Sequence, residues 1–393
     1  MKFEASVNPT KAAAFITPVR WVKENLFNTW LNGLLTLLLL AAIGVVARNT
    51  LEWAINRAQW AVIPANMRVF LTGTYPADQL WRIWTVVLSL VTLSGLSAGA
   101  MGGASHRFAR RLTIAAGLFA LLPLAWSTRW TIACAVALLW ASFLLSRGRT
   151  GLRPWLAAAW VLSLPWTLLL MWGIRSSTLL PRVETTDWGG LTLTLILAAV
   201  GASASFPLGV LLALGRQSRL PVVAWVCTGF IELVRGIPLV SVIFMAHLLV
   251  PLFIPGVNLD KVVRAMIGFT IFTSAYMAEN VRGGLQGVPR GQIEAALAIG
   301  MSGTKAMFLI VLPQALRSVV GSVVGQFISL FKDTSLVAII GLLDLLGVAR
   351  SVMANPVWLG RNVEVYLFIS CLYWIFTYSL SKSSRRLERA LGL

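Results

Sequence analysis

Four charged residues stand inside or at the ends of long apolar runs: Glu232, Arg235, Glu279 and Asp333. An ionisable side chain in such a place is costly unless it has a partner or a function. Glu232 and Arg235 are three residues apart, so a helix would place them on one face, where they can form an ion pair. A glycine and a proline follow within three residues and would break the helix, freeing backbone groups that can bind an ionic ligand. This segment therefore either contacts an ionic substrate or holds a bent helix in place.

Glu279 and Asp333 each have two interpretations. Glu279 ends a predicted span three residues before Arg282, so the two can pair and fix the following loop to the bundle. Asp333 follows another span, where it either faces the mouth of a transport path or caps the next helix. The sequence leaves a path role and a structural role open for both residues.

A polar stretch of small residues separates two of the apolar runs. It begins with Glu294-Ala295-Ala296, contains Gly300 and ends at Pro313. Helix-favouring residues, a glycine breaker, a second helical run and a proline stop predict two short helices joined by a turn on one membrane face. The small side chains of the first helix suit docking into a groove on another protein.

Residues that carry metal, redox or hydrolytic chemistry are scarce. The three cysteines stand singly in apolar sequence, and the two histidines are far apart. No spacing suits a metal site or a redox pair, and no glycine-rich phosphate loop ending in Lys-Ser/Thr occurs. We expect no metal, no cofactor and no catalytic residue in this chain.

The composition predicts an α-helical membrane protein. Of 393 residues, 58% are hydrophobic and only 12% are charged, against about 25% in soluble domains. Long apolar runs satisfy their backbone groups in lipid as helices, whereas the short alternating segments of a barrel are absent. The net charge of +19 is spread over the loops, which argues against a nucleic-acid surface and fits an excess of Lys and Arg on the cytoplasmic side.

About ten transmembrane helices are predicted, with both termini in the cytoplasm. The predicted spans are 31–47, 83–101, 112–126, 130–145, 154–173, 190–214, 222–250, 262–278, 312–331 and 362–380. The span at 222–250 is too long to stand upright, and 112–145 either crosses twice or forms a re-entrant hairpin. We divide the chain into a tail (1–30), N-terminal spans (31–188) with an external segment (48–82), and a core (189–393) with a cytoplasmic loop (282–311).

The polar stretch resembles the EAA loop of binding-protein-dependent ABC transporter permeases. That pattern is E-A-A, three residues, G, nine residues, then I-x-L-P, and here Ile310, Leu312 and Pro313 complete it. The segments E-L-V-R-G-I-P, Y-x-x-E-x-x-R-G and K-D-T-S-L resemble the polar amino acid branch of these permeases. This resemblance covers about 190–385. The long Trp-rich N-terminal half is similar to that of the larger permease subunit of bacterial general L-amino acid systems.

The resemblance implies a permease subunit of an ATP-driven amino acid importer in the bacterial inner membrane. The last five spans would form the permease core and its translocation path. Separate partners would be a cytoplasmic ATPase that binds the ATP, a second permease subunit in a heterodimer, a periplasmic substrate-binding protein and membrane lipid. The implied ATPase-coupling residues are Glu294, Ala295, Ala296, Gly300, Ile310, Leu312 and Pro313. The charged residues Glu232, Arg235, Glu279 and Asp333 would lie on the path or hold the bundle together.

Two alternatives belong to other classes. An ion-coupled secondary amino acid transporter would need carboxylates well inside its spans, and clear examples are scarce here. A membrane scaffold could use the polar loop as an adaptor site, but the broken helices and small-residue clusters favour a protein that moves.

Overall fold

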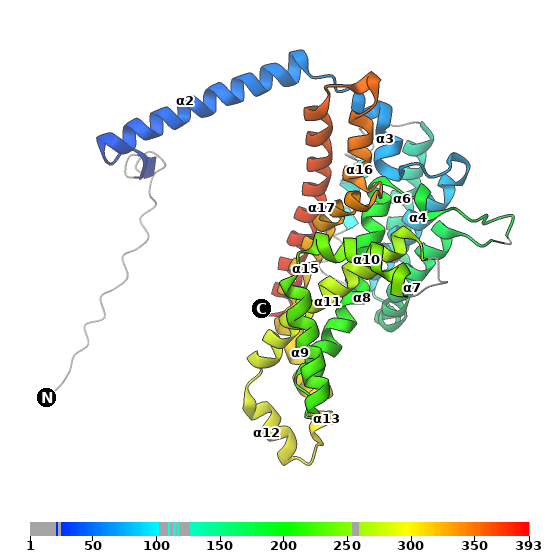
Figure 1. Ribbon diagram of the computed structural model, residues 1–393, viewed down its shortest axis with the longest axis vertical. Helices are drawn as coiled ribbons and strands as arrows, with labels where there is room; N and C mark the ends of the chain where they lie inside the picture. Colours follow the sequence, from blue (N-terminus) through cyan, green and yellow to red (C-terminus); the bar gives the residue numbers. More distant parts are fainter. Residues whose placement is uncertain are drawn as a thin grey trace. The chain divides into compact units, whose positions relative to one another are not determined.

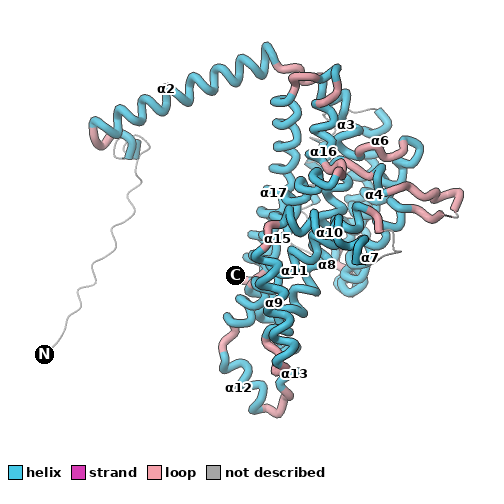
Figure 2. The backbone as a smooth tube through the Cα atoms, viewed as in Figure 1, coloured by secondary structure: helices cyan, strands magenta, loops and turns pink. Residues whose placement is uncertain are grey.

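The computed structural model describes residues 21–22, 25–101, 109–110, 113–114, 116–117, 126–175, 177–253 and 259–392. In these ranges the secondary structure is helical and no β-sheet occurs, which confirms the predicted fold class (Figure 2). The chain divides into two compact units, residues 1–59 and 60–393. This boundary is one of packing, and the functional division at residue 189 stays a prediction.

In the described part of the first unit the long helix is α2 (Trp30–Glu52), which continues as a short π-helical segment, Trp53–Arg57. Its first turn is capped by Thr29, whose Oγ1 accepts a hydrogen bond from the Asn32 amide at 3.2 Å. No residue of α2 is buried, and apolar side chains lie on all its sides. Such a helix suits lipid, and it contains the predicted span 31–47.

The second unit is a bundle of helices of very different lengths (Figure 1). In chain order they are α3 (Val62–Thr72), α4 (Leu80–Met101), α6 (Trp126–Ser146), α7 (Arg153–Trp172), α8 (Gly190–Arg216), α9 (Pro221–Gly236), α10 (Leu239–Phe253), α11 (Lys261–Gly287), α12 (Arg290–Ala298), α13 (Gly303–Ala306), α14 (Leu312–Ser318), α15 (Val320–Asp333), α16 (Leu345–Met353) and α17 (Asn362–Leu391).

Among the described residues, seven helices are long and apolar enough to cross a membrane, or eight if α9 and α10 form one bent span. The axes of α9 and α10 differ by 110° at the predicted Gly-Ile-Pro break. The 27-residue helix α11 is less apolar but packs inside the bundle. With α11, and with the predicted span 112–126 that lies almost wholly outside the described ranges, the chain is consistent with about ten spans.

Helices α8 and α11 lie along each other at the centre of the second unit. Small side chains on α8 allow this close approach. Gly209 faces Met277 of α11, and Gly201 faces Leu330 and Phe269. The small-residue cluster at 201–205 therefore serves helix packing.

The segment 48–82 includes helix α3, which packs against α8, α16 and α17. Its buried side chains Val62 and Phe70 join a cluster with Val348 and Val365, and the Phe70 ring lies 5.2 Å from that of Phe368. An N-terminal helix is thus built into the packing of the C-terminal core.

The segment before α16 also packs on the bundle. A 3-10 helix, Thr334–Ile340, buries Val337 and Ile340, so this apolar segment packs against the other helices. Asp344 then caps α16: its carboxylate accepts hydrogen bonds from the Gly347 amide at 2.9 Å and the Leu346 amide at 3.2 Å. Asp344 is fully buried, and burial raises the pKa of its carboxyl above the usual range.

Candidate coupling loop and charge cluster

The predicted pair of short helices is present as α12 and α13, at the lower tip of the second unit in Figure 1. Glu294 and Ala295 are exposed on α12, whereas Ala296 is only 2% exposed. Ile299, just after the helix, is 77% exposed. The tip therefore presents a carboxylate, small side chains and an unpartnered isoleucine, a surface that suits a groove on another protein.

Gly300 ends α12 because it adopts a left-handed backbone, with φ of +84°. The Gly300 amide donates to the Leu297 carbonyl at 3.0 Å, and the Met301 amide donates to the Ala296 carbonyl at 3.1 Å. These two bonds form a Schellman motif, in which glycine is the favoured residue. The glycine of the EAA pattern thus has a backbone role that any turn of this type would require.

The chain returns to the bundle through a π-helical segment, Met307–Val311, and α14. Pro313 lies in the first turn of α14 and has no amide hydrogen to donate. The Leu312 amide donates to the Met307 carbonyl, five residues back, which is the wider π-type bond. Ile310 and Leu312 are half-buried at this junction.

An apolar cluster connects the loop to the spans. Val311 and Ala315 are buried against Ala213 of α8, Ile231 of α9 and Val281 of α11. Ile293 of α12 packs on the edge of the same cluster. Because α14 packs on α8, α9 and α11 in this cluster, a displacement of α12 and α14 would also displace these three helices.

A cluster of charged side chains lies beside this apolar cluster on the same three helices. Glu279 of α11 is at its centre: its Oε2 accepts a hydrogen bond from Arg282 Nε at 2.9 Å, and its Oε1 accepts one from Arg282 Nη2. Arg216 Nη1 lies 3.6 Å and Arg235 Nη1 3.7 Å from the Glu279 carboxylate. The predicted pair between Glu279 and Arg282 is confirmed.

The expected pair between Glu232 and Arg235 is wrong. Glu232 Oε1 instead lies 3.1 Å from Arg216 Nη1, and Arg235 turns to Glu279 with its guanidinium 5.7 Å from the Tyr276 ring centre. The two residues share a helix, but oppositely charged partners on α8 and α11 are available to each. The cluster therefore joins α8, α9 and α11 in place of bracing α9 alone.

Arg216 is the member of this cluster that the sequence did not single out. It follows the predicted span 190–214, close to Arg219, and both arginines look like ordinary residues of a basic loop. The position of Arg216 in the sequence therefore gave no sign of an ion pair. Two carboxylates and three guanidinium groups meet here, which leaves an excess of one positive charge. The side chains are 26–55% exposed, so an anionic group could reach them.

Asp333 lies apart from the charge cluster, at the end of α15. It is half-buried, makes no hydrogen bond or ion pair with the described part of the chain, and does not cap the 3-10 helix that follows. The predicted helix cap at this position is therefore wrong. The path role of Glu232, Arg235, Glu279 and Asp333 stays a prediction.

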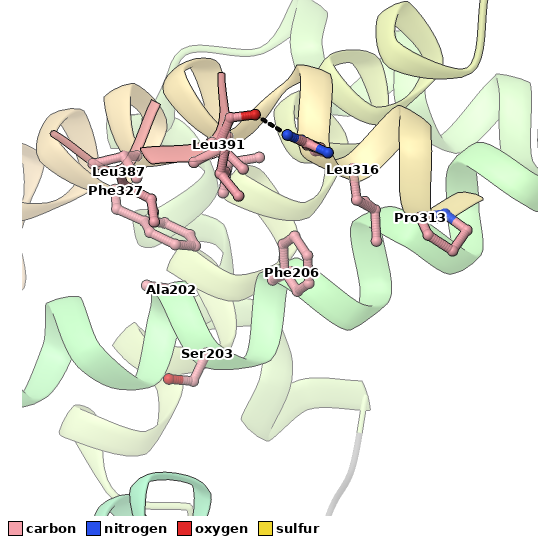
Figure 3. A pocket seen from close by; sticks show the side chains of 12 residues that line it. Ala202, Ser203, Phe206, Pro313, Leu316, Phe327, Leu387 and Leu391 are labelled. Carbon is pink, nitrogen blue, oxygen red and sulfur yellow. Dashed lines mark hydrogen bonds between the residues drawn. The ribbon is translucent and has the colours of Figure 1, made fainter. Parts of the chain in front are cut away.

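An apolar groove of about 630 Å³ lies between α8, α14, α15 and α17 (Figure 3). Phe206 and Phe327 face it, with Leu387 and Leu391 of α17 above. Its cation, Arg317, already donates a hydrogen bond to the Leu391 carbonyl. The groove thus offers little for a polar substrate to bind.

Clusters of metal-ligating side chains do not occur in the described ranges: no three His, Cys, Asp or Glu residues lie close enough to hold an ion. The expected absence of a metal and of a cofactor stays a prediction.

The described helices thus combine a bent pair, α9 and α10, with a charge cluster that joins three helices and an exposed helix pair that packs on the same helices. Residues 205–392 match the family described as binding-protein-dependent transport system inner membrane component. The chain belongs to this family and is a permease subunit of an ABC transporter, a transport component rather than a catalytic one.

Two curated relatives match nearly the whole chain. The inner membrane amino-acid ABC transporter permease protein YhdY of Escherichia coli (strain K12) is 38% identical over 387 residues, covering 94% of this chain and 92% of the relative. The glutamate/glutamine/aspartate/asparagine transport system permease protein BztC of Rhodobacter capsulatus is 35% identical over 425 residues, covering 95% and 93%. The similarity to these two relatives therefore extends into the N-terminal half of the chain. A solved chain described as an amino acid ABC transporter with histidines is 30% identical, covers 51% of this chain and 92% of its own, and has a TM-score of 0.47.

Proposed function

We propose that this chain is one of two permease subunits of an ATP-driven importer of polar amino acids. The observation that carries the proposal is the exposed α12 helix of the EAA pattern, packed through Ile293 onto the cluster where α8, α9, α11 and α14 meet. The substrate class follows from the two full-length relatives, whose names specify amino acids and, for BztC, glutamate, glutamine, aspartate and asparagine.

In this proposal a separate cytoplasmic ATPase binds α12 at Glu294, Ala295 and Ala296. Closure of an ATPase pair moves α12, and the buried contacts of Val311 and Ala315 pass the motion to α11 and the other spans. The charge cluster keeps α8, α9 and α11 moving together, because Arg216 of α8 contacts Glu232 of α9 and Arg235 of α9 contacts Glu279 of α11.

The remaining parts of the proposal concern topology and partners. Both termini lie in the cytoplasm, since that orientation places the EAA loop and most Lys and Arg on the cytoplasmic side. A periplasmic substrate-binding protein delivers the amino acid to the outer face, a second permease subunit completes the path, and lipid surrounds the remaining spans. The ion-coupled alternative gains no support from the relatives, which are ABC permeases.

The test is purification of the whole complex from native membranes with Glu294→Lys and a matched Gln292→Lys control. Both residues are exposed on α12. Charge reversal inside a docked interface weakens binding by about tenfold or more. We expect Glu294→Lys to lose the ATPase and amino acid uptake at an unchanged amount of permease, and Gln292→Lys to keep both. Retention of the ATPase by Glu294→Lys, with normal uptake, would refute the proposed docking.

A further inference from the structure

One face of α15 is polar along its whole length. Ser322, Gln326, Ser329 and Asp333 recur at spacings of four, three and four residues, so they lie on one side of the helix. Gly325 belongs to the same side. A polar face of this length within a membrane span needs water or a polar partner.

The opposite face of α15 is apolar; part of it packs on the chain's own helices, and part lines the apolar groove between α8, α14, α15 and α17. Val323 lies in a cluster with Met277 of α11, Leu330 faces Gly201 of α8, and the Phe331 ring lies 5.4 Å from that of Tyr373 on α17. The apolar residues are Val320, Val323, Val324, Phe327, Leu330 and Phe331. Helices α8, α11 and α17 therefore all lie against the apolar side of α15.

The polar face has no partner in the described part of the chain. The side chains of Ser322, Gln326, Ser329 and Asp333 form no hydrogen bond or ion pair there. All four are exposed or half-exposed, and a methyl group added at Gly325 would meet nothing within 4 Å. Polar side-chain groups left unsatisfied in hydrocarbon are unfavourable, so this face does not border lipid.

We propose that this face of α15 lines the translocation path, and that Gln326 and Ser329 hydrogen-bond the substrate as it passes. The identity of the substrate as an amino acid rests on the proposed function, whereas the position of the face does not. Amide and hydroxyl groups both donate and accept hydrogen bonds, so they suit the ammonium, carboxylate and polar side chain of an amino acid without selecting one sign of charge. Gly325 leaves room beside them.

The first experiment measures water access in the full complex in membranes. Cys134, Cys227 and Cys371 are replaced by serine, and single cysteines are introduced by Ser322→Cys and Ser329→Cys, with Leu330→Cys on the apolar face, at a position only 1% exposed, as control. A positively charged, membrane-impermeant methanethiosulfonate reacts only in water. We expect the two polar-face cysteines to react at least about tenfold faster than the control, and substrate with its binding protein to slow them.

The second experiment separates substrate contact from helix packing. Gln326→Met keeps the length of the side chain and removes its hydrogen bonds, and Val324→Met is the control on the other face. Loss of one or two neutral hydrogen bonds lowers affinity by about three- to tenfold each. We expect Gln326→Met to raise KM for uptake, with the amount of bound ATPase unchanged.

Two results would overturn the inference. Equal labelling of polar-face and control cysteines would place the polar face away from water. Unreactive polar-face cysteines that instead form disulfides with the second permease would assign the face to a dry subunit interface. Neither result touches ATPase docking, so a failure of this inference and a failure of the proposed coupling are distinguishable.

Discussion

Gly283 and Gly284 are neighbours in α11 but meet different surroundings. A methyl group added at Gly283 would have nothing within 4 Å. One added at Gly284 would lie 2.5 Å from the Ala315 carbonyl oxygen and 2.8 Å from a Val319 methyl. Ala315 belongs to α14, the helix that returns from the EAA loop, so Gly284 sets how closely α11 and the loop approach.

The two alanine substitutions should therefore have opposite effects. Both gain about 1 kcal/mol of helix propensity relative to glycine, so this contribution cancels in their comparison. Ordinary van der Waals contact begins near 3.4 Å, about 0.9 Å more than the Gly284 site provides. The obstacle is backbone in a helix and cannot rotate away, and overpacking of this kind costs about 1–3 kcal/mol. We expect Gly284→Ala to be less stable than Gly283→Ala by about that amount.

The assay is thermal unfolding of the purified complex in detergent, together with uptake per ATP hydrolysed in proteoliposomes. Gly283→Ala should unfold at or above the wild-type temperature with normal coupling. Gly284→Ala should unfold earlier and lose transport per ATP, because α14 no longer sits against α11. Equal unfolding temperatures and equal coupling for the two variants would refute the claim that this contact connects loop and bundle.

Two further predictions concern single residues. Gly300→Ala should weaken ATPase binding, because a left-handed backbone costs about 1–2 kcal/mol for alanine, whereas Gly300→Asn should weaken it less, as scored by ATPase retained on purification. Asp344→Ala should lower the unfolding temperature by removing the α16 cap, worth about 0.5–2 kcal/mol, whereas Asp344→Asn keeps an acceptor for the Gly347 amide. Because burial raises the pKa of Asp344, its ionisation lowers the free energy of unfolding as pH rises above about 4. Asp344→Asn should therefore be at least as stable as wild type at pH 7, and a gain that persists unchanged at pH 4 would contradict this explanation.

The sequence predicted best what depends on neighbours along the chain. Hydropathy and length predict the spans, because the free energy of placing a residue in lipid depends mainly on its own side chain. The two short helices of the EAA loop were also predictable, because the glycine turn and the proline stop act within one helical turn of themselves. The break between α9 and α10 followed from a glycine and a proline in the same way.

The ion pairs of the charge cluster were not predictable from spacing. Glu232 and Arg235 satisfy the rule for a pair on one helix, yet each has an oppositely charged partner on another helix. Which partner is used depends on which helices adjoin, and that is fixed by contacts between residues far apart in the chain. Arg216 escaped notice for the same reason, as did the packing of α3 against α16 and α17.

The amphipathic pattern of α15 can be read from its residues, but its meaning needs the structure. A polar face could pack on polar groups elsewhere in the bundle. Only the positions of α8, α11 and α17 reveal that the apolar face is the one they cover. The polar face must therefore contact something other than the described part of the chain.

These features meet at one short segment. Helix α14 is held to α11 through Ala315 and Gly284, and α15 carries the polar face. Between them stands Val319, which leaves helical geometry with φ of −105° and ψ of 8°. A rigid helix would carry any displacement of the loop straight along α15, whereas a break at Val319 lets α15 change its tilt while α14 stays with the loop. In the proposed mechanism, Val319 is therefore the position at which a displacement of α12 and α14 would become a change in the tilt of the polar face of α15.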